Sequence, residues 1–174
     1  SEPGIVTSRN ILFHKGIGKL YRLNSQFSTY NPAYAAGGES GLLNGLKGSL
    51  SFYDGRWQGY QGQDLDIELS FADATPVNTV SIDFLQNFYS WILLPVNVEV
   101  LVSDDGLNYR TAGIVTHNIP QNRSGTIIHN FRCSLNKITT RYLRIIAHYP
   151  GHLPPSHQAP GNPSFIFADE IVIE

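Results

Sequence analysis

Apolar and polar residues alternate with a period of two along most of the chain after residue 60. Leu65, Ile67, Leu69 and Phe71 are each separated by one polar residue, which predicts a strand with one buried face and one solvent-facing side. No stretch repeats apolar residues at helical spacing over three turns. The pattern therefore predicts an all-β fold. The other predicted strands cover residues 80–84, 96–102, 127–133, 141–147 and 165–173.

Turn signals and irregular stretches separate the predicted strands. Residues 103–106, with the sequence Ser-Asp-Asp-Gly, predict a hairpin turn that leads into Tyr109. Short strands at such spacing are typical of β-sandwiches and jelly rolls, and the pattern alone leaves the strand order open. The irregular stretches are 24–60, 86–91 and 148–164. Long loops in compact domains often carry function, so these three stretches are the first candidates for a binding site.

The composition predicts one folded domain with a neutral polar surface. The chain has 174 residues, of which 41% are hydrophobic and 15% are charged, so it can form a core and is too apolar for a disordered chain. Its formal net charge of -2, without a run of Lys or Arg, excludes nucleic acid and anionic membrane surfaces as partners. No apolar stretch approaches the ~20 residues of a membrane span, so no membrane insertion is expected.

The content of cysteine and methionine adds two expectations. Cys133 is the only cysteine, so the chain can form neither an intramolecular disulfide nor a cysteine-based zinc site. Methionine is absent from every position, including the first, and no signal peptide is recognisable at the N-terminus. We therefore expect a processed or excised piece of a longer protein.

The acidic and nucleophilic residues do not form a catalytic pattern. Asp64, Asp66 and Glu68 share the polar face of one predicted strand, whereas the paired carboxylates of a glycosidase face each other across about 5–10 Å. Cys133 alternates in phase with core residues and is expected to be buried. No glycine-rich phosphate loop precedes a helix. We therefore expect no catalytic site.

Several segments resemble one known family, in the same order along the chain. Residues 100–109 resemble its Ser-x-Asp-Gly hairpin, and residues 141–145 resemble its Arg-Tyr-hydrophobic-Arg strand. Residues 167–171 resemble its closing strand. The family is that of the coagulation factor V/VIII C-type domains. These discoidin domains overlap carbohydrate-binding module family 32. Residues 54–60 and 90–95 are similar, more narrowly, to the module appended to bacterial family 20 β-hexosaminidases.

The resemblance covers residues 16–174 and leaves 1–15 as an N-terminal linker or tail. It implies a β-sandwich jelly roll of about eight strands, of the galactose-binding-domain type, whose end loops hold sugars. It also implies one structural calcium ion, which takes hard oxygen ligands. Asn44 stands where the family usually has Asp, so the ion would lose one negative charge and affinity should fall. At matching positions the implied ligands are Asn44, the carbonyl of Lys47, Ser49, the carbonyl of Ala168 and Glu170.

Sugar recognition needs a flat aromatic face for the apolar side of a pyranose, with planar polar groups around it for the hydroxyls. Arg56, Trp57, Gln58 and Tyr60 supply these residue types in one glycine-flexed segment. They form the first candidate carbohydrate-binding group. The alternative is that Trp57 belongs to the core, as a large aromatic beside a strand usually does.

Asn87, Tyr89 and Trp91 form the second candidate carbohydrate-binding group. Phe88 and Tyr89 are adjacent and would point to opposite faces of an extended chain, so one of them should be exposed. We expect Tyr89 to be the sugar platform, because exposed loop aromatics tend to be binding groups.

His152, in the loop 148–164, is a further candidate for hydrogen bonding to sugar hydroxyls. Three prolines in this loop exclude the helix on which a His-x-x-x-His metal pair would depend. The alternative is that the loop histidines have no function.

Together these features predict a non-catalytic module that binds glycans ending in galactose, N-acetylgalactosamine or N-acetylglucosamine. The resemblance implies a module that is monomeric by itself and is joined to the catalytic domain of a bacterial glycoside hydrolase. The implied location is extracellular, periplasmic or on the outer-membrane surface. Two alternatives stay open: an adhesion or protein-interaction module, which would expose aromatics without polar neighbours, and a structural domain that binds nothing.

Overall fold

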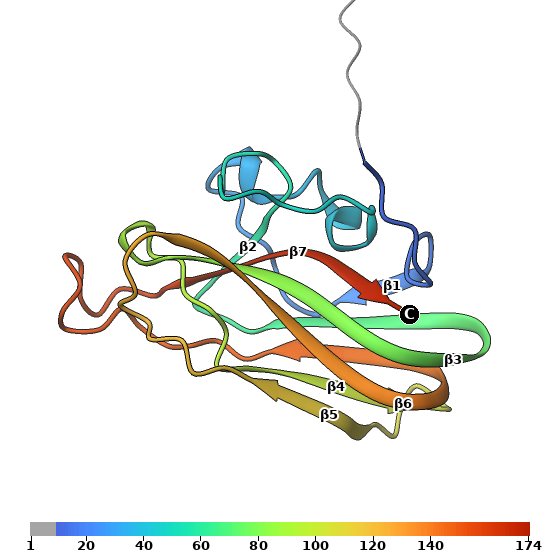
Figure 1. Cartoon of the computed structure of the whole chain (residues 1–174). Helices are drawn as coiled ribbons and strands as arrows, with labels where there is room; N and C mark the ends of the chain where they lie inside the picture. The colour runs from blue at the N-terminus through green and yellow to red at the C-terminus, as the bar shows by residue number, and fades with distance from the viewer. Residues whose placement is uncertain (1–9) are drawn as a thin grey trace, which may run out of the picture.

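The computed structural model describes residues 10–174, which form seven strands and three short 3-10 helices (Figure 1). Every strand pair is antiparallel, and the all-β prediction is confirmed. Among these residues no helix has the length and apolar character that a bilayer-spanning helix requires. The elements are β1 (Leu20–Leu23), η1 (Pro32–Tyr34), η2 (Glu39–Leu43), β2 (Gln58–Gln61), β3 (Leu65–Asn87), η3 (Phe88–Ser90), β4 (Asn97–Ser103), β5 (Arg110–Thr116), β6 (Thr126–Ala147) and β7 (Phe165–Ile173).

β3 and β6 are long enough to run through both layers of the sandwich. They pair in two long zones, residues 65–70 with 142–147 and residues 79–87 with 126–134. A short paired stretch, 75–77 with 138–140, lies between these zones, with a register shift on each side of it. Both strands bend there, towards the right of Figure 1. The first zone shares its layer with β1, β4 and β5, and the second shares its layer with β7 and β2. The predicted strands 65–71 and 80–84 are therefore two halves of β3, and the predicted strands 127–133 and 141–147 are two halves of β6.

Apolar side chains from both layers fill the space between them. Leu65, Ile67 and Leu69 of β3 are buried, whereas Asp66 and Glu68 between them are partly exposed, as the alternation predicted. Burial of a side chain of this size contributes about 1.5–3 kcal/mol. The period-two pattern thus determines which face of β3 forms the core.

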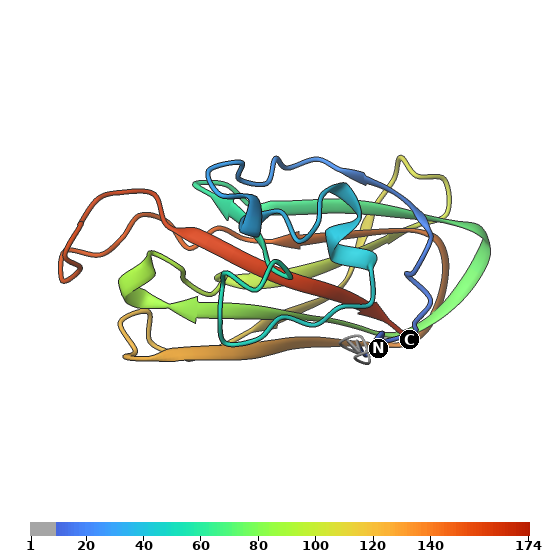
Figure 2. The same ribbon diagram turned by 90° about the horizontal axis from the view of Figure 1, so that it is seen from above.

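β7 differs from the other strands because all nine of its residues are buried. Ile166 and Ile171 face the main core, while Phe165 and Phe167 join a second apolar cluster on the opposite side. Residues 24–57, which we call the covering segment, lie over this side of β7 and carry η1 and η2 (Figure 2). The covering segment therefore forms a third layer, and its edge contributes to the candidate site.

The described part of the predicted N-terminal tail packs on the sandwich. The Lys15 N–H donates to the Ile173 carbonyl at 2.9 Å, and the Leu12 N–H donates to the Gly45 carbonyl at 2.9 Å. The packed domain therefore begins before residue 16. Residues 1–9 of the predicted tail lie outside the described residues.

Candidate functional site

A pocket of about 420 Å³ opens where the covering segment meets η3 and the start of β7. Its volume is in the range typical of small-molecule sites. Seven of the residues that line it are aromatic, so we call it the aromatic pocket. Its lining consists of Tyr30, Tyr34, Phe52, Tyr53, Gln61, Tyr89, Ser90, Trp91 and Phe165.

Tyr34 anchors the covering segment at the base of the aromatic pocket. Asn31 begins η1, and its side-chain Oδ1 accepts from the Ala33 N–H at 3.0 Å while Pro32 occupies the first turn. This short turn places the Tyr34 ring edge-on against Phe167, with ring centroids 4.9 Å apart. Tyr34 is buried, so its ring supports the pocket from below.

Tyr30 and Tyr53 form the outer part of this wall. The Tyr30 ring is stacked on Tyr34 at a centroid distance of 6.4 Å, and the Tyr53 ring lies 5.9 Å from Tyr34. Their side chains are 84% and 58% exposed, respectively. Exposed apolar residues that gather in one place often mark an interaction site, so two exposed aromatic residues around one pocket indicate a binding surface.

The opposite wall is η3, whose turn is held by Asn87. The Asn87 Oδ1 accepts from the Ser90 N–H at 3.2 Å, and its Nδ2 donates to the Thr126 hydroxyl at 2.9 Å. Trp91 then adopts a left-handed backbone with φ 67°, a conformation that is uncommon for a bulky residue. Asn87 therefore positions the aromatic residues of η3 from behind, and it is not itself part of the lining.

Phe88 is buried and Tyr89 is exposed, so one of the two aromatic residues lies outside, as expected. Phe88 is buried, and its carbonyl contacts the Nε2 of His157 at 2.9 Å. Tyr89 is 63% exposed and lines the aromatic pocket. A 3-10 turn produces this arrangement, and not the extended chain that was predicted. His157 of the loop 148–164 thus supports η3 and is buried.

Trp57, Gln58 and Tyr60 do not reach the surface, so the prediction that they contact sugar is wrong for this structure. All three have 0% exposure, because β2 pairs with β7 beneath the covering segment. The Trp57 Nε1 donates to the Ser49 carbonyl at 2.9 Å. Gln58 Nε2 donates to the carbonyl of Gly38 at 2.9 Å, and its Oε1 accepts from the Tyr60 hydroxyl. These side chains hold the covering segment in place.

Arg56 and His152 are exposed but lie outside the pocket lining. The Arg56 Nη1 donates to the Lys47 carbonyl at 3.2 Å, and the backbone of His152 forms a bridge with Pro163. Of the predicted carbohydrate-binding residues, Tyr89 and Trp91 are therefore the two that line the aromatic pocket.

The wall that the covering segment contributes to the pocket was not predicted from the sequence. The irregular stretch 24–60 was recognised as a candidate loop, but its aromatics could not be assigned to a surface before the fold was known. Tyrosine in a loop beside glycine and asparagine was the available signal. The lining residues that were not predicted are Tyr30, Tyr34, Phe52, Tyr53, Gln61 and Phe165.

A larger hollow of about 520 Å³ lies along β1 and the residues after it. Its two aromatic residues, Tyr21 and Phe27, are partly buried and pack against the main core. It therefore offers no exposed aromatic face for a sugar ring. The aromatic pocket is the better candidate despite its smaller volume.

The oxygens expected to bind calcium are engaged with protein groups. The Glu170 carboxylate, fully buried, lies 2.7 Å from His14 Nε2 and accepts from the Asn44 N–H at 3.0 Å. The Asn44 Oδ1 accepts from the Leu46 N–H at 2.9 Å, and the Ser49 carbonyl accepts from Trp57 Nε1. The Lys47 carbonyl accepts from Arg56 Nη1, and Ala168 lies inside the sheet between β2 and β3.

A lysine ammonium lies beside the neighbouring carboxylates. Lys47 Nζ is 3.0 Å from Asp83 Oδ2 and 3.3 Å from Asp169 Oδ1. Burial raises the pKa of Asp169 to about 7, against the opposing effect of Lys47. Among residues 10–174 no group of three or more His, Cys, Asp or Glu side chains is placed to hold a metal ion. The expected ligand set does not fit calcium in this arrangement.

We expect excess EDTA and excess calcium chloride to leave the melting temperature of the domain unchanged, because Lys47 and His14 already contact the acidic groups. The substitution Lys47→Met, which keeps most of the side-chain stem, should instead lower the melting temperature by a few degrees, since it leaves Asp169 without its cation. Thermal melts followed by circular dichroism, with EDTA and with calcium chloride, measure the melting temperatures of the wild type and of Lys47→Met. A calcium-dependent rise in the wild-type melting temperature would contradict the expectation.

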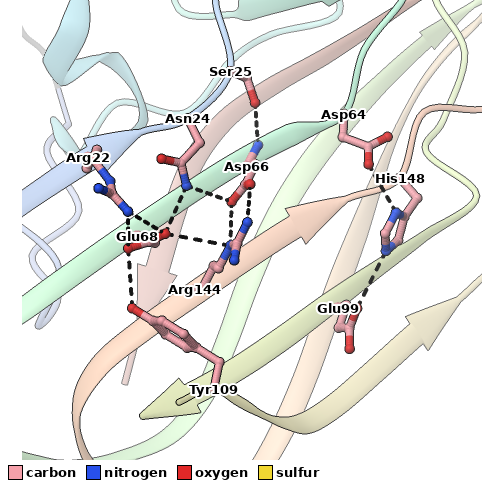
Figure 3. Close-up of polar contacts among 10 residues, drawn as sticks. All are labelled: Arg22, Asn24, Ser25, Asp64, Asp66, Glu68, Glu99, Tyr109, Arg144 and His148. Atoms are coloured by element: carbon pink, nitrogen blue, oxygen red, sulfur yellow. Dashed lines mark hydrogen bonds and ion pairs between the residues drawn. The ribbon is translucent and has the colours of Figure 1, made fainter. Parts of the chain in front are cut away.

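The carboxylates of β3 are held in a charged network on the outer face of the sheet (Figure 3). Arg144 binds Asp66 with both Nε and Nη2, at 2.9 and 2.6 Å, and Arg22 Nη2 lies 3.0 Å from both oxygens of Glu68. Burial works to raise the pKa of Asp66, but hydrogen bonds from Arg144 and Asn24 outweigh it and lower that pKa. Paired, ionised carboxylates are unsuited to act as the proton donor of a glycosidase.

His148 belongs to the same face of the sheet and not to the aromatic pocket. Its Nδ1 lies 3.2 Å from Asp64 Oδ2 and its Nε2 lies 3.6 Å from Glu99 Oε2 (Figure 3). Asp64 precedes β3, His148 follows β6 and Glu99 lies within β4, so these two contacts join three segments of the sheet. The acidic residues that were considered as a catalytic pair therefore make contacts that connect neighbouring segments of the sheet.

The sequence matches no protein-family model and has no significant match among curated proteins. Solved structures are similar in fold. A family 32 carbohydrate-binding module of Streptococcus pneumoniae EndoD superposes with a TM-score of 0.54 at 13% identity, covering 91% of this chain and 97% of that one. A Clostridium perfringens family 32 module, in complex with GalNAc-β-1,3-galactose, has a TM-score of 0.50 at 12% identity, with coverages of 88% and 93%.

A third similar structure is the family 32 module of AlyQ, in complex with 4,5-unsaturated mannuronic acid. Its TM-score is 0.52 at 15% identity, and the match covers 92% of this chain and 98% of that one. At these identities the superpositions establish architecture. The chain therefore has the discoidin-like β-sandwich fold of the family 32 carbohydrate-binding modules.

Proposed function

We propose that this chain is a non-catalytic carbohydrate-binding module and that the aromatic pocket holds the terminal sugar of a glycan. The observation that carries the proposal is the convergence of three exposed tyrosines, Tyr30, Tyr53 and Tyr89, on one pocket from separate segments of the chain. Gln61 and Ser90 stand among them and can hydrogen-bond sugar hydroxyls. Polar groups between the aromatics favour a sugar over an apolar protein partner.

The chemistry of the lining suits a pyranose ring. The rings of Tyr30, Tyr53 and Tyr89 offer flat apolar surface to the C–H face of a sugar, and their hydroxyls offer hydrogen bonds. Tyrosine side chains lose little conformational entropy on binding, because they have few rotatable bonds. A few such contacts yield about 4 kcal/mol, which corresponds to a Kd of about 1 mM. Weak binding to terminal sugars is the expected behaviour.

The similar solved structures support this proposal. They are carbohydrate-binding modules, and the Clostridium perfringens module holds GalNAc-β-1,3-galactose. We propose glycans ending in galactose, N-acetylgalactosamine or N-acetylglucosamine as ligands. We also propose that the module serves a secreted or surface glycoside hydrolase, outside the cytoplasm, by keeping that enzyme near its glycan.

The test is a titration of the domain with galactose, N-acetylgalactosamine, N-acetylglucosamine and chitobiose, followed by NMR chemical shifts. We expect saturable shifts with at least one sugar at millimolar concentration, confined to residues around Tyr53, Gln61 and Tyr89. Maltose serves as a control ligand, because it has the size of chitobiose but an α linkage and no N-acetyl groups. Flat responses to all four sugars from a folded sample would contradict the proposal and favour a structural or protein-binding role.

A further inference from the structure

We infer that the aromatic pocket selects uncharged sugars and rejects uronic and sialic acids. The inference rests on the proposed function and specifies the class of ligand. All nine residues that line the pocket are aromatic or neutral polar residues. Their polar atoms are tyrosine hydroxyls, the indole N–H of Trp91, the amide of Gln61 and the hydroxyl of Ser90. Burial and the hydrogen bond with Tyr53 raise the pKa of Tyr34, so this phenol stays neutral.

Asp54 and Arg56, the charged residues that follow Tyr53, form hydrogen bonds with groups outside the aromatic pocket. The Asp54 carboxylate accepts from the Ser49 N–H at 2.7 Å and from the Arg56 N–H at 2.9 Å. The Arg56 guanidinium donates to the Lys47 carbonyl, and neither residue lines the pocket. In the described part of the chain, no cation is therefore placed to receive an acidic group inside the aromatic pocket.

A carboxylate would bind poorly between these walls for two physical reasons. Removing a carboxylate from water is costly unless a charged donor, usually arginine, replaces the lost hydration. Aromatic rings also carry partial negative charge on their faces, which repels an anion stacked on them. An alcohol at the same position of the sugar meets neither penalty. The alcohol and acid forms of a sugar should therefore differ in affinity because of their charge and not because of their size.

The experiment compares three forms of one sugar that differ only at carbon 6. Whichever sugar saturates the domain is tested as its ordinary alcohol, as its uronic acid and as its uronamide, by the same NMR titration at pH 7. We expect the uronic acid to bind at least about tenfold more weakly than the alcohol. The neutral uronamide, which has the shape of the acid, should bind within about threefold of the alcohol.

A gain-of-function variant tests the charge argument from the protein side. Gln61 is exposed at the end of β2, so Gln61→Arg should fold normally and place a cation at the pocket. This variant should bind the uronic acid at least about fivefold more tightly than the wild type, whereas the neutral control Gln61→Met should not. Thermal melts of both variants show that the fold is intact.

The possible outcomes separate the inference from the proposed function. Equal binding of alcohol and acid by the wild type would overturn the inference and leave the proposed function standing. Rejection of both acid and uronamide would overturn it as well, because the pocket would then select by shape. Absence of binding by every neutral sugar would overturn both.

Discussion

Replacing Tyr89 with alanine should abolish measurable glycan binding while leaving the fold intact. The Tyr89 ring is 63% exposed and belongs to the aromatic pocket, so its removal takes away stacking surface and little core packing. A loss of about 1.4 kcal/mol weakens binding tenfold, which moves a Kd of about 1 mM out of the measurable range. Exposed substitutions usually change stability by less than about 0.5 kcal/mol. Calorimetric titration and a thermal melt of the same sample measure both effects.

Two control variants make the Tyr89 result specific. Tyr89→Phe keeps the ring and removes the hydroxyl, so it should retain most of the binding if stacking dominates. Phe13→Ala removes another exposed aromatic side chain, which is not part of the pocket lining, and should leave binding unchanged. Unchanged binding by Tyr89→Ala would remove Tyr89 from the site and would count against the aromatic pocket.

Replacing Trp57 with alanine should lower the free energy of unfolding by about 3–5 kcal/mol, the usual cost of truncating a buried tryptophan. Trp57 has no exposed surface and packs with Tyr34, Phe165 and Phe167. A Cβ atom on Gly48 would lie 2.2 Å from its ring, so the surroundings are tightly packed. Since whole domains are stable by only about 5–15 kcal/mol, this loss is severe. Urea unfolding followed by circular dichroism measures it.

The Trp57 experiment also separates the two interpretations of this residue. Trp57→Phe keeps an aromatic ring in the core and should cost less than the alanine variant. A sugar platform would behave in the opposite way: Trp57→Ala would fold with nearly wild-type stability and would lose glycan binding. That outcome would show that Trp57 is exposed in solution and would contradict the burial described above.

The contrast between Trp57 and Tyr89 shows how position in the fold decides the role of an aromatic residue. Both stand in irregular, glycine- or asparagine-containing stretches of sequence. Trp57 leads into β2, which pairs with β7 and lies under the covering segment. Tyr89 lies in a 3-10 turn that ends a strand at the edge of the sandwich. The Trp57 ring is enclosed between β7 and the covering segment, whereas the Tyr89 ring has a free face.

Local sequence was sufficient for the strands with a clear alternation and for the orientation of their side chains, whereas β1 and β2 were not predicted. Period-two alternation depends only on neighbouring residues, so β4, the two halves of β3 and the buried face of β3 could be predicted without knowledge of the fold. The exposure of only one of Phe88 and Tyr89 was also predicted, although a 3-10 turn and not an extended chain produces it. The neutral polar composition likewise predicted a surface suited to uncharged polar ligands.

The tertiary structure alone decided which residues form the site. Tyr30, Tyr53 and Tyr89 lie in segments up to 59 residues apart, and they meet because the covering segment folds over β7 beside η3. The contacts of Lys47 with Asp83 and Asp169, and of His14 with Glu170, also join distant parts of the chain. Local pattern cannot specify such contacts, because their energy depends on which strands pair and which segments cover them.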